Sequence, residues 1–428
     1  MTRKSIKITL SHLFLVSLIF LSLFLSYYLW FQEKKTPVQS SEPSNTKIVE
    51  FKKEMLLPIN TIHHKQGKIT HLTQNNTLTN LHSQLSQFSL SKRTLTKKVL
   101  SKNYFQKFGN NEALEFLYQE EFDLSDYIDT YFQNNGHTTV KPFLFHRILL
   151  DFKQKLLIFV AKDEMHITSF KIRGDFDKMK RSISKYKKFE IPLSLGHSIL
   201  PNHYYFDEPI QLKKYSFLLE QQSHTSIANE LLGPTNKEIT KNKEPLFIYY
   251  ENSNHENVQF DQSSSIISFN GLFEKNDKRN IFTSFYFLDK IETFIKNFRY
   301  FETCQNKISY RNFINNIPIF KREKNETLTV QFKKTNKTLP SDIQINLDTD
   351  ALQIPVPQND TISLPKTADI MQELSQKEGI DISSISDFTI GYVWDETDNP
   401  KIADFSPSWF IRYGKEWVPL LKLLGGDI

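Results

Sequence analysis

Two short stretches near the C-terminus decide the expected fold: residues 388–394, FTIGYVW, and residues 408–413, SWFIRY. Both are rich in β-branched and aromatic residues, which favour strands. The turn-forming segment DETDNP lies between them at residues 395–400, so together they predict an antiparallel strand pair. In the second strand Trp409 and Tyr413 share one face with Ile411, whereas Phe410 and Arg412 point to the other.

Upstream of this pair, helical and strand patterns alternate irregularly. Residues 367–377 predict a helix with Thr367 as its cap, and the runs FLFHRILLD (143–151) and KLLIFV (155–160) predict a hairpin. Further helices are expected at residues 78–88, 112–118, 175–188, 225–232 and 291–300. Further strands or extended pieces are expected at residues 47–51, 63–72, 214–219, 246–251, 258–260, 265–269, 307–313, 327–332 and 343–348. This mixture predicts an α+β fold with antiparallel sheets.

The N-terminus carries the pattern of a membrane anchor. Arg3, Lys4 and Lys7 precede an apolar run at residues 8–31, which is long enough for a bilayer-spanning helix. Its bulky aromatic end lacks the small residues of a signal-peptidase site, so an uncleaved anchor is favoured over a signal peptide. The positive-inside rule then places residues 1–7 in the cytoplasm and the rest of the chain outside.

The length and the net charge limit how many domains and which kinds of partner to expect. With 428 residues, more than one folded unit is expected. We predict a polar linker at residues 32–47, then three extracellular α+β domains at residues 48–200, 201–279 and 280–428. The net charge of +6 is a mild excess without long single-sign blocks, which does not indicate nucleic-acid binding.

Two sets of residues are candidates for partner contact. Ser11, Ser22 and Ser26 fall on one side of the predicted membrane helix, where small residues let two helices approach closely. The alternative is that serine is simply tolerated in the span. Trp409 and Tyr413 are the second set, and for them the alternative is packing in the core of the strand pair.

The only cysteine offers one enzymatic hypothesis. Thr303 and Cys304 followed by Arg311 superficially match a sortase, in which a thiolate lies beside an arginine. However, the residues before Thr303 are expected to be helical, whereas a sortase has a strand there. A structural cysteine is therefore favoured.

Other catalytic patterns are incomplete. Residues 182–185 (SISK) match S-x-x-K, but the further motifs of penicillin-recognising enzymes do not follow. His63 and His64 are adjacent and do not form a zinc-hydrolase motif. The acids between Glu120 and Asp129 could serve a glycosidase in type only. We therefore predict no enzyme, with no catalytic, cofactor or metal residues, and a binding or regulatory role.

The C-terminal residues carry a resemblance. Residues 379–417 resemble the end of the YycH family, where an I-G-Y strand is followed by a P-x-W strand and a final tryptophan. The matching positions are Ile390, Gly391, Tyr392, Pro407, Trp409, Phe410, Ile411, Arg412, Tyr413 and Trp417. Residues 316–320, 213–232 and 145–151 resemble further elements of the family in the same order. Residues 285–301 depart from it because they lack the expected glycines, which puts individual residue roles in doubt.

The resemblance implies a function. Family members are expected to regulate the WalK/YycG sensor histidine kinase of low-GC Gram-positive bacteria, and so cell-wall metabolism. They act with a YycI-like protein through transmembrane and extracytoplasmic contacts, without catalysis or a small-molecule substrate. The alternative left open is an extracytoplasmic protein that binds or modifies the cell wall.

Overall fold

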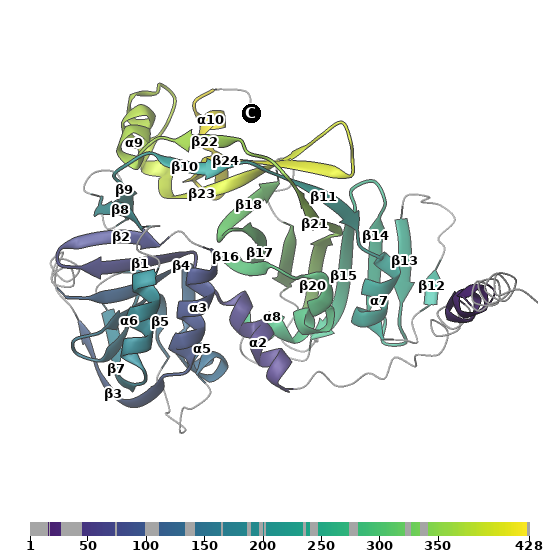
Figure 1. The fold of residues 1–428 in the computed structure, drawn as a ribbon, viewed down its shortest axis with the longest axis horizontal. Helices are drawn as coiled ribbons and strands as arrows, with labels where there is room; N and C mark the ends of the chain where they lie inside the picture. Colours follow the sequence, from purple (N-terminus) through teal and green to yellow (C-terminus); the bar gives the residue numbers. More distant parts are fainter. Residues whose placement is uncertain are drawn as a thin grey trace, which may run out of the picture. The chain divides into compact units, whose positions relative to one another are not determined.

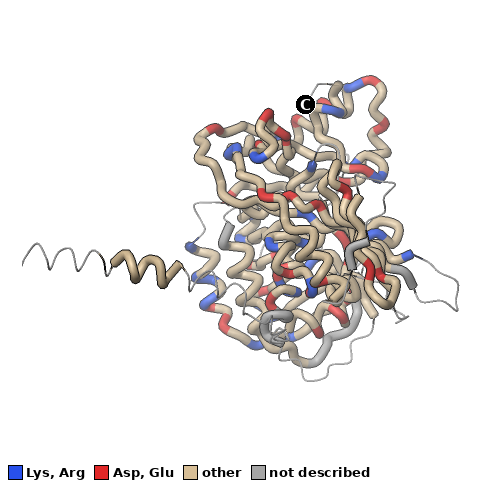
Figure 2. Tube along the Cα trace, turned by 90° about the vertical axis from the view of Figure 1, so that its right-hand side faces the viewer, with Lys and Arg blue, Asp and Glu red and all other residues tan. Residues whose placement is uncertain are grey.

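A computed structural model describes residues 16, 18–26, 45–72, 75–98, 111–132, 142–163, 166–185, 190–196, 200, 203–233, 237–239, 247–273, 281–321, 327–333 and 341–425. Residues 1–48 and 49–428 form two separate units. In the first unit, residues 18–26 are helical and carry no charged residue (Figure 2). Their apolar side chains are exposed, with Phe20 and Phe24 at 69% and 64%.

No helix within the described residues is long and apolar enough to cross a membrane. The rest of the predicted span (residues 8–15, 17 and 27–31), the predicted cytoplasmic segment and residues 32–44 of the linker lie outside the described residues. The membrane anchor therefore stays a prediction.

The second unit begins within helix α2 (Asn45–Met55) and continues with a nine-stranded antiparallel sheet, hereafter the first sheet (Figure 1). The predicted hairpin at residues 143–160 is confirmed as β5 and β6 at the centre of this sheet. The strand order is β3 (Ser89–Lys98), β7 (His166–Arg173), β6 (Leu156–Val160), β5 (Leu144–Asp151), β4 (Ala113–Asp123), β1 (Asn60–Lys65), β2 (Lys68–Leu72), β8 (Glu190–Leu195) and β9 (Tyr204–Phe206).

Three helices cover one face of the first sheet: α3 (Asn75–Ser86), α5 (Leu124–Tyr131) and α6 (Phe176–Lys185) (Figure 1). The buried Phe116, Ile148 and Phe159 form a common core with Leu81 of α3 and Met179 of α6. Successive strand residues face opposite sides, so this face takes every second residue of β4, β5 and β6.

A larger sheet of 14 strands, hereafter the second sheet, follows in the chain. Its order is β12 (Lys237–Ile239), β13 (Phe247–Glu251), β14 (Asn257–Asp261), β15 (Ile266–Phe273), β20 (Ser341–Asp348), β19 (Leu328–Phe332), β17 (Lys307–Ile314), β18 (Ile317–Lys321), β23 (Ile385–Glu396), β24 (Ile402–Tyr413), β11 (Tyr215–Gln221) and β21 (Asp350–Val356), with β16 (Phe298–Cys304) paired to β17 and β25 (Glu416–Pro419) paired to β24. The β18–β23 pair is parallel. The mixed α+β class with mostly antiparallel sheets is confirmed.

The expected C-terminal strand pair is present as β23 and β24, with Ile390 opposite Trp409. Gly391 of β23 is required for a steric reason. A Cβ atom on Gly391 would lie 2.5 Å from the ring of Phe320 and 2.7 Å from that of Phe410. Those two rings stack with centroids 3.8 Å apart, so only glycine leaves room for the stack.

The remaining elements are short. A two-stranded sheet joins β10 (Ile210–Lys213) to β22 (Thr361–Leu364). The helices are α7 (His224–Leu232), α8 (Ile281–Leu288), η2 (Asp289–Phe294), α9 (Thr367–Gln376), η3 (Ile382–Ser384) and α10 (Leu420–Leu423). Helix α9 was predicted, but Thr367 is not its cap, because the Thr367 hydroxyl accepts a hydrogen bond from the Phe206 backbone N–H.

Three predicted elements are wrong. Residues 112–118 were expected to be helical but belong to strand β4, and residues 47–51 were expected to be extended but belong to helix α2. Residues 291–300 divide between the 3-10 helix η2 and strand β16, and the α-helix in this region is α8.

The predicted domain boundaries mark changes of sequence pattern rather than breaks in strand pairing. Strand β9 lies beyond residue 200 yet completes the first sheet. Strand β15 lies before residue 280 yet pairs with β20, and β11 pairs with β24. Residues 201–279 and 280–428 therefore share one sheet.

Candidate functional site

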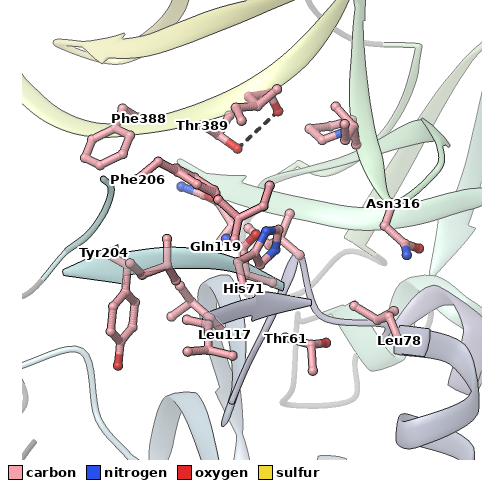
Figure 3. A pocket seen from close by; sticks show the side chains of 18 of the residues that line it. Thr61, His71, Leu78, Leu117, Gln119, Tyr204, Phe206, Asn316, Phe388 and Thr389 are labelled. Carbon is pink, nitrogen blue, oxygen red and sulfur yellow. Dashed lines mark hydrogen bonds between the residues drawn. The ribbon is translucent and has the colours of Figure 1, made fainter. Parts of the chain in front are cut away.

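A cavity of about 440 Å³ lies where the first and second sheets meet (Figure 3). The first sheet supplies lining residues from β1, β2, β4 and β8, and the opposite wall comes from β10, β23 and the turn between β17 and β18. Its volume falls in the range of small-molecule sites, roughly 300–1,000 Å³. Hereafter it is called the inter-sheet cavity.

Most of the lining is apolar. Ile62, Leu117 and Leu193 come from the first sheet, whereas Leu212 and Ile390 come from the opposite wall. The strand positions explain this. Ile62 and Leu117 point to the same face of the sheet, and Phe116, beside Leu117 in the chain, packs in the helix-covered core.

The aromatic end of the cavity includes a predicted contact residue. Trp409 is only 2% exposed, and its ring lies 5.8 Å from both Phe206 and Phe388. Its indole N–H donates a hydrogen bond to the Pro365 carbonyl oxygen at 3.1 Å. Trp409 therefore packs in the core, as the alternative interpretation expected, and its partner contact is untested.

His71 is one of several polar residues in the lining. Burial lowers the pKa of His71 to about 4, so its ring is neutral at pH 7. The ring lies edge-on to Phe206 with centroids 5.5 Å apart. Its Nδ1 atom is buried and has no hydrogen-bond partner within the part of the chain that the structure describes.

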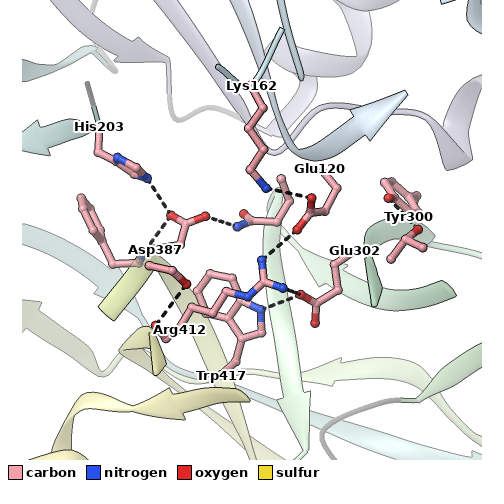
Figure 4. A network of polar contacts seen from close by, with 12 residues as sticks. Glu120, Lys162, His203, Tyr300, Glu302, Asp387, Arg412 and Trp417 are labelled. Atoms are coloured by element: carbon pink, nitrogen blue, oxygen red, sulfur yellow. Dashed lines mark hydrogen bonds and ion pairs between the residues drawn. The ribbon is translucent and has the colours of Figure 1, made fainter. Parts of the chain in front are cut away.

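Beside the cavity, a group of charged and polar side chains connects the two sheets (Figure 4). We call it the inter-sheet network; it consists of Gln119, Glu120, Lys162, His203, Glu302, Asp387 and Arg412. The Arg412 guanidinium donates to Glu120 at 2.8 Å and lies 3.3 Å from Glu302. Lys162 also pairs with Glu120, at 2.8 Å.

Asp387 makes the second connection in this network. The Gln119 amide donates a hydrogen bond to Asp387, and a ring nitrogen of His203 lies 3.4 Å from its other oxygen. Since Gln119 belongs to β4 and Asp387 to β23, this contact also joins the two sheets.

The charges of the network depend on one another. Burial raises the pKa of Glu302, although the nearby Arg412 opposes this shift. Burial alone would lower the pKa of Arg412, but hydrogen bonding to Glu120 and the carboxylates of Glu302 and Asp387 outweigh it and raise the pKa. Arg412 is therefore the cation on which the junction depends.

A separate group of charges is enclosed in the first sheet. In this group, hereafter the Glu115 cluster, Glu115 accepts hydrogen bonds from Tyr204 (2.6 Å), His64 (2.8 Å) and Arg147 (3.1 Å). Burial would raise the pKa of Glu115, but the hydrogen bond from His64, the charge of Arg147 and the hydrogen bond from Tyr204 lower it to about 2. The carboxylate is thus ionised and fully paired.

The other predicted contact residues are not among the lining residues of the cavity. The half-buried Tyr413 accepts a hydrogen bond from the Asp381 backbone N–H at 3.1 Å. Ser22 and Ser26 are exposed on the helix of the first unit, and Ser11 lies outside the described residues.

The enzymatic candidates are not brought together. Cys304 does end a strand, β16, contrary to the helix expected before it. However, Cys304 is opposite Lys307 whereas Arg311 is opposite Arg299, four residues along β17 and so about 13 Å away. The Arg311 guanidinium instead lies 4.0 Å from the ring centre of Phe320.

Other catalytic patterns are likewise unsupported. The Ser182 hydroxyl accepts a hydrogen bond from Gln84, and Lys185 is exposed. Within the described residues, no group of three or more His, Cys, Asp or Glu side chains could hold a metal ion. The site therefore provides a cavity that could bind a ligand, and polar contacts that join the two sheets.

Sequence reasoning missed the inter-sheet network. It placed Arg412 on the strand face opposite Trp409 but did not name it as a site residue, and it named Glu120 only among the acids of a possible glycosidase. The available signal was Arg412 itself. An arginine inside an otherwise apolar and aromatic strand needs a charged or polar partner when it is buried, so its position indicates a contact with another element.

Comparisons with known proteins fit this architecture. Residues 201–424, more than half of the chain, match the family model described as "YycH protein, C-terminal domain". The crystal structure of YycH from Bacillus subtilis superposes with a TM-score of 0.67 at 14% identity, covering 86% of this chain and 96% of that chain. No curated protein matches the sequence. On the family match, with the same fold present in a solved YycH, this chain belongs to the YycH family.

Proposed function

We propose that this chain is a membrane-anchored, non-catalytic regulator of a WalK/YycG-type sensor histidine kinase, acting with a YycI-like partner at the cell membrane. The observation that carries the proposal is the family match over residues 201–424, since this family suggests such a regulator. The fold similarity to YycH of Bacillus subtilis supports the same assignment.

The first unit supplies the proposed membrane contact. Its helical residues 18–26 expose apolar side chains, and basic residues precede the apolar run in the sequence. These features support a single span with the N-terminus in the cytoplasm and the domains outside the cell. Such a span would lie beside the spans of the kinase, with Ser11, Ser22 and Ser26 as the contact face.

The proposed mechanism is a shift of the kinase between two states. A regulator changes such an equilibrium only through contacts that differ in free energy between the states. A difference of about 1.4 kcal/mol changes the ratio of the states tenfold. A few helix contacts in the membrane, or a modest outer-domain contact, are therefore sufficient.

Two chimaeras test which part carries the regulation. One places residues 4–35 on an unrelated outer domain, and the other places residues 36–428 on an unrelated anchor. We expect the full chain to co-purify with the kinase, and the chimaera that retains binding identifies the contact region. If the full chain neither co-purifies with the kinase nor alters its output, the proposal is wrong.

Matched substitutions refine the membrane contact. Ser22→Leu with Ser26→Leu should weaken association if the serine face packs on the kinase, because leucine prevents close approach. Phe20→Leu with Phe24→Leu is the control, since it changes the same spacing on the opposite side of the helix. If both pairs of substitutions weaken association with the kinase equally, the serine face is not the contact surface.

The alternative of a cell-wall protein is tested in parallel. Purified peptidoglycan should not retain the full chain above the level of an unrelated outer domain. Turnover of peptidoglycan that disappears in Cys304→Ala would contradict the non-catalytic assignment.

A further inference from the structure

We propose that the inter-sheet cavity binds a long aliphatic chain that ends in a carboxyl or ester oxygen, as in a fatty acid or the acyl chain of a membrane lipid. This inference does not depend on the regulation of a kinase. It rests on the lining, the unpaired Nδ1 atom of His71 and the charges of the cavity.

The lining favours an aliphatic body. Leu117 and Leu193 on one wall oppose Leu212 and Ile390 on the other, and Phe206 lies at the aromatic end. In a cavity of about 440 Å³ with such walls, binding is favourable when the methylene groups of a ligand leave water and replace the water in the cavity. The labelled side chains extend from Phe388 at one end of the view to Asn316 and Leu78 at the other (Figure 3), which suits an elongated ligand.

One buried polar atom calls for an oxygen atom on the ligand. The Nδ1 atom of His71, a residue of the lining, has no hydrogen-bond partner within the described residues. Leaving such groups unpaired is unfavourable, so a ligand oxygen beside His71 would be bound more tightly than a methylene. Figure 3 shows His71 near the middle of the view.

The charges favour an acidic over a basic head group. The lining cations are Arg147, Lys162 and Lys213, and the lining anions are Asp163 and Asp387. Both anions already have partners, in His166 for Asp163 and in Gln119 and His203 for Asp387. Two of the cations are paired as well, Arg147 with Glu115 and Lys162 with Glu120. Lys213 is exposed and forms no ion pair within the residues that the structure describes. An amine would therefore be repelled by Lys213, whereas a carboxylate would be attracted to it.

Photo-crosslinking of the full-length chain in lipid nanodiscs tests the proposal. The probe is a tetradecanoate with a diazirine in its chain, and labelled peptides are mapped by mass spectrometry. We expect labels within residues 59–72 and 387–392, because these two segments contain lining residues of the cavity. Labels confined to residues 16–26 would show partitioning into the bilayer only and would overturn the proposal.

Competition by saturated carboxylates of eight to fourteen carbons measures the aliphatic contact. Each added methylene should strengthen competition about fourfold until the cavity is filled. Tetradecylamine should compete far more weakly than tetradecanoate. No dependence on chain length, or equal competition by the amine, would contradict the proposed ligand.

Variants with matched controls locate the head group. His71→Phe keeps the ring contact with Phe206 but removes the ring nitrogens, and should weaken competition about tenfold. Lys213→Glu should weaken binding at low salt, whereas Lys214→Glu, whose residue is not part of the lining, should leave it unchanged. Ile390→Trp should block labelling, and Ile354→Trp on exposed β21 should not.

A second probe distinguishes the source of the chain. Phosphatidylglycerol that carries the same diazirine is built into the nanodisc in place of the free acid. Labels on residues 59–72 from this lipid alone identify a lipid acyl chain as the occupant, and labels from the free acid identify a fatty acid. No label on these residues from either probe overturns the proposal.

Discussion

The Glu115 cluster and the inter-sheet network both use strand β4, yet they differ in enclosure and in what they connect. In the cluster, the side chains of Glu115, His64 and Arg147 are 0%, 1% and 4% exposed. In the network, Glu120 and Arg412 are 16% and 15% exposed and Lys162 is 48% exposed. Five residues along one strand thus separate an enclosed ionic group from one that solvent reaches.

The difference assigns them different roles. Breaking an enclosed ion pair leaves an uncompensated charge in a medium of low polarity, whereas water compensates part of the loss at a solvated pair. The Glu115 cluster therefore fixes the first sheet itself. The inter-sheet network joins the two sheets through charged contacts that solvent reaches.

Removing the charge of the enclosed group should have the largest effect. Glu115→Gln leaves Arg147 without its carboxylate and should lower the free energy of unfolding by about 3–5 kcal/mol. Urea denaturation measures this. Glu416→Gln, at an exposed position of β25, is the control and should change little. A cost below about 1 kcal/mol for Glu115→Gln would contradict the structural role of the cluster.

Acid should destabilise the folded protein over a pH range that is set by the lowered pKa values of buried side chains. The pKa of His71 is lowered to about 4, so below pH ~6.5 the unfolded chain binds a proton that the folded chain does not. The free energy of unfolding should therefore fall as pH drops from about 6.5 to 4, by up to about 1.4 kcal/mol per pH unit for this one group. Glu115, with a pKa of about 2, stays ionised there and contributes its loss only at lower pH.

Urea denaturation at several pH values checks the contribution of His71. His71→Phe should reduce the slope of stability against pH, whereas His255→Phe, at a highly exposed position, should not. Equal slopes in the wild-type chain and His71→Phe would show that His71 is not the group that titrates.

The junction should respond more mildly and more locally. Arg412→Met removes the cation shared by Glu120 and Glu302 and should cost roughly 1–3 kcal/mol, between the exposed and enclosed limits. Hydrogen exchange should rise at the contact of β4 with β23 but not in the β5–β6 hairpin. Faster exchange throughout the first sheet would show that the network also holds that sheet together.

The smallest effect is expected at the exposed end of the network. Lys162→Met removes an ion pair whose lysine is about half exposed, and should cost about 0.2–1 kcal/mol. The cost should shrink further at high salt, since exposed pairs are screened. If Lys162→Met lowers the free energy of unfolding as much as Arg412→Met does, the exposed and the less exposed ion pairs of the network do not differ in strength.

The sequence predicted those elements whose pattern is local. The β23–β24 pair was predicted because both strands and the turn between them carry their own signals. Strand β4 was missed because Ala113, Leu114 and Glu115 favour helices in isolation. In the fold it lies between β1 and β5, and its burial on both faces outweighs that preference.

The site was harder to predict because its contacts span the chain. Arg412 and Glu120 are 292 residues apart, and no local pattern encodes such a contact. The same holds for Asp387 and Gln119, which are 268 residues apart. The inter-sheet cavity arises only when the two sheets meet, so neither sheet's sequence indicates it.

The central claim is that this chain regulates a sensor kinase of the WalK/YycG type. The most direct test is the rate of kinase autophosphorylation in proteoliposomes, with and without the full-length chain and its YycI-like partner. We predict a change in rate that depends on this chain, and that is lost when both residues 1–48 and the outer domains are exchanged for unrelated ones. An unchanged rate at saturating amounts of both proteins would contradict the account.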